Sequence, residues 1–564
     1  MRDDTPHRSW REREAAAEAR GIALDPKRDP VAGIQAFRTL YVPGHVLISG
    51  EPVAARDALS KAAAELGWDV ELETVRDAGE PLTRARIVQA PHPRRDDEPV
   101  PPVDAWRLLQ QARRRVIERA KARGRGDNPD RIAAAKRDVS LAASRSLDQP
   151  VARRRRHADR DLVVADRALR AVGLDHVLVV DPIGLAPHGR TNPHGRTNPH
   201  GRTNPHGRTN PAGVEGYALA GTGGLEVVDF VGPSPVRTAP LAAGGRRPVV
   251  AFFDTGCGEV DGWLPAETGQ NDIVRRRLPS PTHPGKVIGV EDPATDPEVH
   301  GDQSGPLDGF LDEAAGHGTF VAGIIRQVAP EADLVSVRVA DSNGTVLESE
   351  LIDAIEELAV WAEDNPLDVV NLSLGYAHET PEDGLFSRRL LQSLHRLRAL
   401  GCVIVCSAGN EATDRPTFPA ALYDWGDVDL SIDEPPGLSA HVAVGALNPQ
   451  RTSVALYSNL GPWVTTFAPG SSVLSCFPRL SGGVQAGSRA DLYGRRRQSL
   501  DPDDHTTGFA IWSGTSFAAP YVAGRVAAAL APGLMQGAAA VRDADVVAAV
   551  LADIDTEDGS RHRG

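Results

Sequence analysis

Four short segments carry side chains that can catalyse acyl transfer. Asp254 ends the apolar run VVAFFD, His317 lies between two glycines in GHGT, Asn410 ends the run VIVCSAGN, and Ser516 stands within SGTSFAAP. A hydroxyl nucleophile, an imidazole base and a carboxylate that orients the base form one catalytic unit, and an amide can donate a hydrogen bond to an oxyanion. Taken singly, each residue also has an ordinary structural reading, such as a helix cap or a turn.

The surroundings of Ser516 and His317 suit this chemistry. Both residues precede stretches of helical composition, and Pro520 fits a first helical turn, where backbone amides have no partner within the helix. We therefore expect Ser516 at a helix N-terminus, where the helix dipole favours negative charge that forms nearby. The imidazole of His317 titrates near neutrality, which suits a group that takes up and returns a proton.

Together the four segments resemble the signature of the subtilisin-like serine peptidases, or subtilases. The chain order Asp, His, Ser is that of subtilisin, and His317 argues against the related sedolisins, in which an acidic residue replaces the histidine. The resemblance extends to NLSLG at 371–375 and to the stretch 461–476 before the nucleophile. It covers about residues 245–535, and these motifs in this order are highly specific.

The resemblance implies a role for each catalytic residue. Ser516 is expected to attack the peptide carbonyl, His317 to act first as base and then as acid, and Asp254 to hold the imidazole. The implied function is a serine endopeptidase, a hydrolase that cleaves protein or peptide substrates through an acyl-enzyme by a Ser-His-Asp charge-relay mechanism.

The resemblance also implies the substrate contacts. Asn410 and the backbone amide of Ser516 are expected to bind the oxyanion. The segment Ser373, Leu374 and Gly375 is expected to pair with an extended substrate as one strand with another.

Two rival functions stay open. The chain is alternatively a catalytically silent subtilase-fold module that binds peptides, or an effector with the same chemistry that is held inactive until a signal arrives. The complete catalytic set favours the enzyme. No metal enters this chemistry, so no cofactor is required for it. Subtilases often bind structural calcium, but no loop here can be assigned to it, and the metal ligands are unknown.

The order of elements predicts the architecture around these residues. Strands are expected at 248–253, 334–339, 369–374, 403–406 and 441–444, and helices at 318–327, 347–364, 387–400 and 516–530. Strands that alternate with helices indicate a mainly parallel sheet covered on both faces, with sites at the carboxyl ends of its strands. We therefore predict an α/β fold, a three-layer subtilisin-like catalytic domain preceded by a smaller α+β N-terminal region.

The chain is predicted to divide into five parts. These are a polar segment at 1–35, an α+β region at 36–182, a low-complexity linker at 183–213, a peptidase domain at 214–555 and a polar tail at 556–564. In the α+β region, strands near 45–48 and 69–75 flank a helix at 54–66, and a further helix is expected near 103–123. The region is either a propeptide-like segment that inhibits the site from within the chain, or a regulatory domain that binds a partner.

Two insertions depart from the family pattern. One is acidic and rich in Pro and Gly, at 292–313, and the other spans 478–508 and contains the run RRR. Both are expected to border the cleft and to shape access to it.

The unit HGRTNP occurs four times in succession from His188 to Pro211. Such units contain too little apolar surface to offset the entropy of ordering, which predicts a linker. A metal-binding tract is the alternative, because a histidine recurs every six residues, although the carboxylates or cysteines that usually complete a site are missing.

Charge and composition limit the partners and the cellular compartment that we expect for this protein. Between Arg107 and Arg160, seventeen Lys or Arg accompany six Asp or Glu, which predicts either a solvated helix face or a basic arm for an acidic partner. The whole chain carries a formal net charge of −14, which argues against general nucleic-acid binding.

No run of eighteen apolar residues and no secretory signal are visible, and four cysteines do not suggest a disulfide scaffold. We therefore expect a cytoplasmic protein without a membrane span.

Three of the four cysteines have positions that can be interpreted from the sequence. Cys257 follows Asp254 by three residues, so it is either a thiol that makes activity sensitive to thiol reagents or a small buried residue. Cys402 and Cys406 are expected in core strands.

Overall fold

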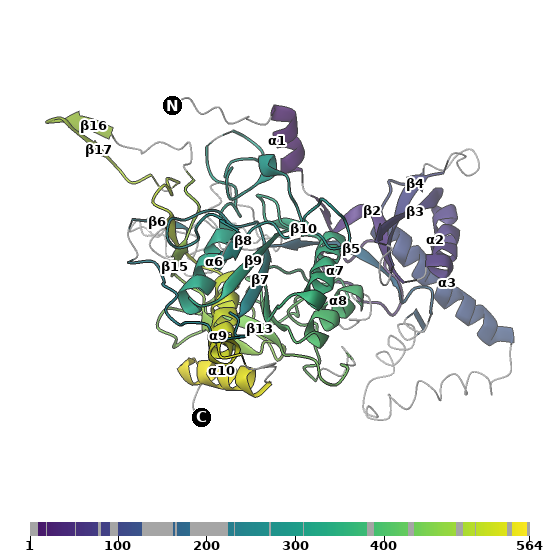
Figure 1. Cartoon of the computed structure of the whole chain (residues 1–564). Helices are drawn as coiled ribbons and strands as arrows, with labels where there is room; N and C mark the ends of the chain where they lie inside the picture. Colours follow the sequence, from purple (N-terminus) through teal and green to yellow (C-terminus); the bar gives the residue numbers. More distant parts are fainter. Residues whose placement is uncertain are drawn as a thin grey trace.

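A computed structural model of the chain (Figure 1) describes residues 9–18, 20–50, 52–76, 81–90, 100–126, 162–163, 166–180, 224–229, 232–269, 272–307, 309–380, 388–426, 432, 434–480, 489–501, 503–537 and 544–560. The HGRTNP repeats and most of the basic stretch, including its RRRR run, lie outside the described residues, so the predictions about them stay predictions.

A seven-stranded sheet forms the centre of the catalytic part, which is the region from residue 224 onward. Its order is β14-β13-β12-β11-β7-β9-β8, and every pair of neighbours is parallel. The strands are β7 (Val249–Asp254), β8 (Val274–Arg275), β9 (Asp333–Arg338), β11 (Val369–Leu372), β12 (Val403–Ser407), β13 (His441–Leu447) and β14 (Thr466–Pro469). All five strand positions expected from the sequence are confirmed, because runs rich in Val, Ile and Ala are buried on both faces of a parallel sheet.

Helices cover both faces of this sheet. They are α6 (His317–Val328), α7 (Glu348–Asp364), α8 (Arg388–Ala399), α9 (Thr515–Met535) and α10 (Ala544–Glu557). The alternation along β7 shows the two layers: Val250 and Phe252 pack in one hydrophobic cluster with residues of α6 and α9, and Ala251 and Phe253 pack in another with residues of α7 and α8. The predicted three-layer α/β fold is confirmed.

Among the described residues, α9 is the one helix that is long and apolar enough to cross a membrane. However, 67% of its most apolar window is buried inside the protein. The helix packs against α6 and against β11, β12 and β13, as the core helix of a globular domain does. α10 continues to Glu557, two residues beyond the predicted domain end at 555, and its last residue pairs with Arg451 and Arg525.

The N-terminal region has its own sheet and core. Its strands are β1 (Ile22–Ala23), β2 (Leu40–Ser49), β3 (Trp68–Arg76), β4 (Leu82–Gln89) and β5 (Val172–Val179), and all their pairings are antiparallel. Helices α2 (Pro52–Leu66) and α3 (Ala105–Gly126) pack with it around Trp68 and Trp106. The expected β-α-β pattern and the following helix are confirmed, which completes the predicted α+β architecture of this region.

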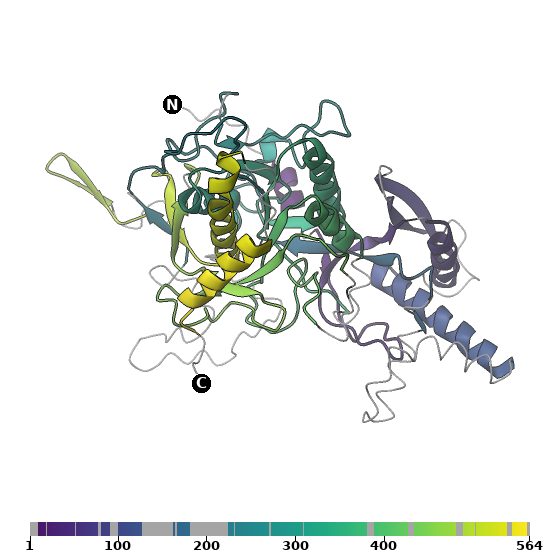
Figure 2. The same ribbon diagram turned by 60° about the horizontal axis from the view of Figure 1, so that its bottom comes forward.

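The N-terminal sheet continues into the catalytic part. Strand β10 (Thr345–Leu347) pairs antiparallel with β5, with Val346 opposite Leu178. Figures 1 and 2 show the N-terminal region, in purple and blue, beside α7 and α8. The short helix α1 (Trp10–Ala17) adds a second contact, because the Arg13 guanidinium binds the Asp302 carboxylate and nearby backbone carbonyls of the acidic insertion.

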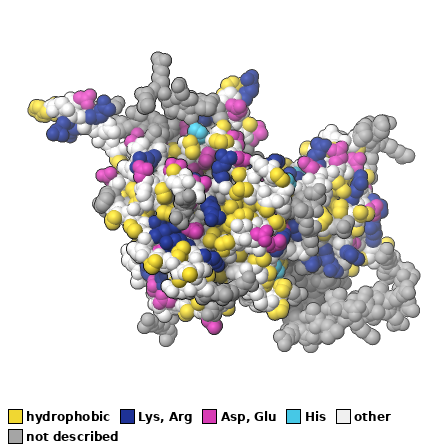
Figure 3. Space-filling view, viewed as in Figure 1, with side chains coloured by type: hydrophobic (Ala, Val, Ile, Leu, Met, Phe, Trp, Pro, Cys, Tyr) yellow, Lys and Arg dark blue, Asp and Glu magenta, His cyan; other side chains and the backbone are white. Residues whose placement is uncertain are grey.

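The remaining elements lie around this core. They are β6 (Glu226–Val228), the short helix η2 (Pro293–Thr295), β15 (Val473–Cys476), β16 (Arg489–Leu492), β17 (Arg495–Gln498) and β18 (Phe509–Trp512). The β16–β17 hairpin of the second insertion projects away from the body in both views, so this part does not border a cleft as expected (Figures 1 and 2). On the face seen in Figure 3, acidic and basic side chains are interspersed.

Candidate active site

The carboxylate of Asp254 stands at the carboxyl end of the central strand β7. The backbone amides of Val339 and Ala340 donate to its carbonyl, which fixes the strand end against the residues after β9. Its Oδ1 accepts from the Thr255 amide at 2.8 Å and from the Thr255 hydroxyl at 3.2 Å. The side chain is completely buried, so these bonds and the neighbouring imidazole hold a carboxylate that water cannot reach.

His317 begins α6 and faces Asp254. Its Nδ1 lies 2.8 Å from Oδ1 and 3.0 Å from Oδ2 of that carboxylate, which selects the tautomer with the proton on Nδ1. Within the described residues, Nε2 has no hydrogen-bond partner. The ring packs against the aromatic side chains of Trp512 and Phe517, at centroid distances of 5.8 and 5.2 Å. An imidazole in this state can accept a proton at Nε2.

Two glycines allow this close approach. A Cβ on Gly318 would lie 2.1 Å from the Gly256 carbonyl oxygen, so any larger residue would push the start of α6 away from the turn after Asp254. Gly316 caps α6 with a φ of 79°, in the left-handed region that glycine adopts most easily. The glycines around the histidine therefore bring helix and strand end together.

Ser516 is the second residue of α9, as the sequence predicted. Its Oγ donates to the Ser373 carbonyl at 3.3 Å, and the Ser373 hydroxyl donates to the Ser516 carbonyl at 2.8 Å. The structure thus brings the serine against the predicted substrate-binding segment and the aspartate against the histidine. No hydrogen bond joins Ser516 to His317 among the described contacts, and catalytic hydrogen bonds are often unformed without substrate.

Asn410 follows β12 and contacts the start of α9. Its Oδ1 accepts from the Thr515 amide at 2.9 Å, and the Thr515 hydroxyl accepts from the Gly409 amide at 3.0 Å. These bonds fix the orientation of the side-chain amide, so Nδ2 is the end that can donate. The predicted oxyanion donor is therefore hydrogen-bonded to Thr515, the residue directly before the predicted nucleophile.

Sequence reasoning missed one residue of the site, Glu298 in the acidic insertion. Its carboxylate accepts from the hydroxyls of Thr255 and Thr319, both at 2.5 Å, and from the Gly318 amide at 3.2 Å. It joins the turn after Asp254 to the first turn of α6. Burial, together with nearby negative charge, raises the pKa of Glu298 to about 7. No spacing or motif distinguishes this glutamate from its acidic neighbours, so it could not be singled out from the sequence.

The predicted substrate-binding segment is itself paired with the N-terminal region. Val179 exchanges two backbone hydrogen bonds with Gly375, of 3.0 and 3.1 Å, and the Val180 amide donates to the Gly344 carbonyl at 2.7 Å. Leu374 between these contacts is buried. The end of β5 thus lies between β10 and the segment after β11.

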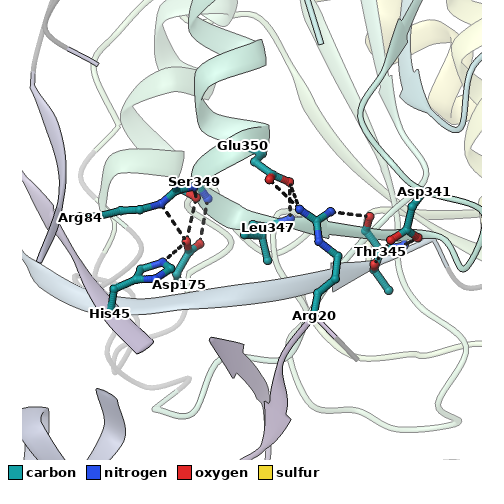
Figure 4. A network of polar contacts seen from close by, with 9 residues as sticks. All are labelled: Arg20, His45, Arg84, Asp175, Asp341, Thr345, Leu347, Ser349 and Glu350. Atoms are coloured by element: carbon teal, nitrogen blue, oxygen red, sulfur yellow. Dashed lines mark hydrogen bonds and ion pairs between the residues drawn. The ribbon is translucent and has the colours of Figure 1, made fainter. Parts of the chain in front are cut away.

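Polar contacts beside this pairing fix β5 to α7, as Figure 4 shows. The Asp175 carboxylate accepts from the Ser349 amide at 3.0 Å and from its hydroxyl at 2.7 Å, at the N-terminus of α7. His45 lies 2.7 Å from the same carboxylate, and Arg84 donates to the Ser349 hydroxyl. Arg20 contacts Glu350 with 2.6 Å to each oxygen.

One cluster in the described part of the chain has metal-ligand character. The donor atoms of His176, His378 and Glu379 lie within 4.8 Å of one another, and all three residues are buried. Both ring nitrogens of His176 already face carboxylates, those of Glu348 and Glu379. Calcium prefers oxygen ligands, so this cluster does not fit the calcium site that the resemblance left open.

The cysteines have structural positions. Burial raises the pKa of the Cys257 thiol to about 12, which favours the small buried residue over the reactive thiol. Cys402 and Cys406 are buried beside and within β12, as expected, and none of the four cysteines, all of which the structure describes, forms a disulfide.

Comparison with known proteins agrees with this geometry. Residues 245–552, more than half of the chain, match the model of the Subtilase family. The chain is 28% identical over 295 residues to an intracellular serine protease of Paenibacillus polymyxa, covering 50% of this chain and 66% of that protein. It is 28% identical over 221 residues to subtilisin DY of Bacillus licheniformis, covering 38% and 62%.

Two further similarities are more limited. Subtilisin E of Bacillus subtilis (strain 168) is 29% identical over 240 residues, covering 41% of this chain and 50% of that protein. The three matches thus span less than two thirds of each relative. A crystal structure of a cold adapted subtilisin-like serine proteinase aligns with 53% of this chain and 82% of its own at 23% identity, with a TM-score of 0.30. That score is too low to support an argument about the site.

Proposed function

Because the chain belongs to the subtilase family, we propose that it is a serine endopeptidase that hydrolyses peptide bonds through an acyl-enzyme on Ser516. The observation that carries the proposal is the state of His317, whose Nδ1 is held by Asp254 while Nε2 has no hydrogen-bond partner in the described structure. A buried imidazole in that state, beside the helix that bears a serine in its first turn, is the arrangement of a general base.

The reaction begins when Ser516 Oγ leaves the Ser373 carbonyl and turns toward Nε2 of His317. The imidazole takes the hydroxyl proton as Oγ attacks the substrate carbonyl, and Asp254 stabilises the imidazolium. His317 then returns the proton to the leaving amine, and water repeats both steps on the acyl-enzyme. Every proton moves through the imidazole of His317, and the negative charge forms on the substrate carbonyl oxygen, so the proposed chemistry needs no cofactor.

The oxyanion of the tetrahedral intermediate is bound by Asn410 Nδ2 and the Ser516 amide. Support comes from the bond between Asn410 Oδ1 and the Thr515 amide, which orients the donating end of the side chain before substrate arrives. A donor that needs no reorganisation stabilises the transition state more than the ground state.

We also propose that substrates bind as an added strand along Ser373 to Gly375. The pairing of Val179 with Gly375 supports this, because it shows that an extended chain fits there. In the same antiparallel register, the substrate residue two positions after the one paired with Gly375 would lie opposite Ser373. The Ser373 carbonyl accepts from Ser516 Oγ, so the register leads the substrate to the nucleophile.

The N-terminal region is proposed to inhibit the site from within the chain. Its strand β5 holds the position that a substrate strand would take, and the exposed fractions of Asp254, His317 and Ser516 are 0%, 0% and 2%. A substrate must therefore displace the end of β5. The same occupation favours the second candidate function, a signal-gated subtilase-fold protein whose activity is absent until β5 is released.

The setting remains a proposal. The prediction of a cytoplasmic enzyme is supported by the similarity to the Paenibacillus polymyxa protein, which is named an intracellular serine protease. Structural calcium also stays open, with no assigned ligands.

Labelling with a fluorophosphonate tests the function, because this probe reacts only with an activated serine. The full chain is compared with Ser516→Ala and with Ser453→Ala, which changes an exposed serine outside the site. We expect labelling of the wild type and of Ser453→Ala, and none of Ser516→Ala. A folded wild type that stays unlabelled, even after Val179→Pro has removed the amide that pairs with Gly375, would contradict the proposal.

A further inference from the structure

The end of β5 binds the catalytic part through backbone hydrogen bonds on both edges. Val179 pairs with Gly375 on one side, and β10 pairs with residues 177–179 on the other. This is the geometry by which an extended peptide is recognised between two strands, with the side chains of alternate residues left to give specificity.

Alternate side chains of β5 face the catalytic part. Leu178 and Val180 are fully buried in the hydrophobic cluster that contains Val346 and Leu374. Successive side chains of a strand point to opposite faces, so His176 shares the face of Leu178 and Val180. Any peptide bound in this register therefore presents the side chain at the position of His176 to the same surface.

The surface around His176 is made of two carboxylates and a tyrosine. The imidazole Nδ1 lies 2.5 Å from Glu348 Oε2, and Nε2 lies 2.8 Å from Glu379 Oε2. The ring stacks on Tyr376 at a centroid distance of 4.4 Å and an angle of 23°. The Tyr376 hydroxyl donates to the other oxygen of Glu348 at 3.0 Å. Because both ring nitrogens face carboxylates, the pocket holds the doubly protonated ring, which is a cation.

Charge around the pocket agrees with this state. Burial by itself would lower the pKa of His176, but the two carboxylates outweigh it and raise the pKa to about 10. Burial lowers the pKa of the neighbouring His378 to about 3. Two arginines interact electrostatically with Glu379: Arg113 belongs to α3 and would leave with the N-terminal region, and Arg415 belongs to the catalytic part.

We propose that Glu348, Glu379 and Tyr376 form a subsite of the substrate cleft for a cationic side chain. This subsite takes the residue three positions before the one paired with Gly375, and the inference rests on the proposed endopeptidase function. The substrate class is an extended peptide with a basic residue there and aliphatic residues two and four positions later, as in His176, Leu178 and Val180.

Arginine suits the subsite best. Its planar guanidinium can stack on the Tyr376 ring and donate to both carboxylates at once, whereas a lysine ammonium can do only the second well. A neutral side chain would leave Glu348 and Glu379 buried with no counter-charge from the substrate, which is strongly unfavourable. The pocket therefore favours a cationic substrate side chain both by attracting it and by disfavouring a neutral one.

The test uses the full chain with both Val179→Pro and His176→Ala, which lacks the amide that donates to Gly375 and the imidazole that fills the subsite, so that both positions are open to peptides. Two quenched peptides carry the sequence of residues 172–180 and one common cleavable tail, and differ only at the position of His176, where one has arginine and the other neutral citrulline. We expect kcat/KM to be about 100-fold higher for the arginine peptide. Adding Glu379→Gln should reduce this ratio to below about 10-fold, while Glu363→Gln, on the exposed end of α7, should leave it unchanged.

Each outcome decides the proposal. Equal rates for the two peptides, with fluorophosphonate labelling of Ser516 intact, overturn the subsite and leave the proposed function standing. Absence of both hydrolysis and labelling in a folded protein overturns both. If circular dichroism shows that the chain with both substitutions does not fold, the same peptides are compared on His176→Leu, whose β5 lacks the competing cation.

Discussion

Two buried histidines of this chain are paired with carboxylates in different ways. His317 contacts Asp254 through Nδ1, and its Nε2 has no hydrogen-bond partner among the described residues. His176 contacts Glu348 through Nδ1 and Glu379 through Nε2. Both rings are almost completely buried, and each lies beside aromatic side chains.

The second nitrogen decides what each imidazole can do. A ring held at one nitrogen keeps the other for proton transfer, which is the requirement for a general base. A ring held by carboxylates at both nitrogens is fixed as a cation and can serve only as an anchor. The comparison teaches that burial and a carboxylate partner do not by themselves indicate catalysis, and the following changes test it from the largest expected effect to the smallest.

Removing each imidazole should separate the two roles. We expect His317→Ala to lower kcat for peptide hydrolysis on the order of 10⁶-fold, because nucleophile and base act as one unit. His176→Ala should not lower kcat at all. Steady-state kinetics on both full-length variants provides the measurement, and a comparable loss in both would remove the distinction.

The oxyanion donor should give a smaller loss. Asn410→Ala is expected to lower kcat on the order of 10²- to 10³-fold, with KM little changed, because the donor acts on charge that develops only in the transition state. Kinetics with a quenched peptide measures both constants. A rise in KM with kcat unchanged would instead assign Asn410 to substrate binding.

His176, the ring held at both nitrogens, should control how easily a reagent reaches Ser516. Removing one partner of a buried ion pair costs about 3 kcal/mol or more, so His176→Ala should raise the rate of fluorophosphonate labelling about 100-fold through easier release of β5. The pKa of His176 is raised from 6.5 to about 10, so its stabilising contribution is complete below about pH 6.5, declines steadily as the pH rises above that value, and is lost by about pH 10. An unchanged labelling rate would mean that His176 does not hold the strand.

Glu298 offers a fourth buried carboxylate, one without an imidazole partner. Its pKa is raised from 4.5 to about 7, so the folded state binds the proton more tightly than the unfolded state. The free energy of unfolding should therefore fall as the pH rises from about 4.5 to 7, by on the order of 3 kcal/mol. Glu298→Gln should flatten this slope in urea unfolding, and an identical slope in the variant would show that another group titrates.

The smallest effect is expected at the cap of α7. Asp175→Ala removes the carboxylate that accepts from the Ser349 amide and hydroxyl, and should lower the free energy of unfolding by about 2 kcal/mol. Asp57→Ala, an exposed position on α2, is the matched control and should change it by less than about 0.5 kcal/mol. Equal effects would show that the Asp175 contacts add no stability.

Local patterns were sufficient to predict the elements that bear the proposed catalytic residues. Asp254 at a strand end and Ser516 and His317 at helix starts follow from apolar runs, glycines and Pro520, all within a few residues of each side chain. The parallel sheet followed from the alternation of strands and helices. These features are encoded by neighbours along the chain, which is why a single sequence indicates them.

Contacts between distant segments could not be predicted in this way. Glu298 reaches Thr255 across 43 positions, and His176 reaches Glu379 across 203. Neither pairing follows from a periodic pattern in the sequence. The first depends on where the acidic insertion packs against the central sheet, and the second on where β5 packs against the catalytic part. The pairing of Val179 with Gly375 could not be predicted for the same reason.

The most direct test of the account is the hydrolysis of one quenched peptide by three full-length proteins: the wild type, Val179→Pro and the double variant Val179→Pro with Ser516→Ala. The account predicts slow hydrolysis by the wild type, faster hydrolysis by Val179→Pro, and none by the double variant. Activity that survives in the double variant, or a folded Val179→Pro protein that is no faster than the wild type, would contradict it.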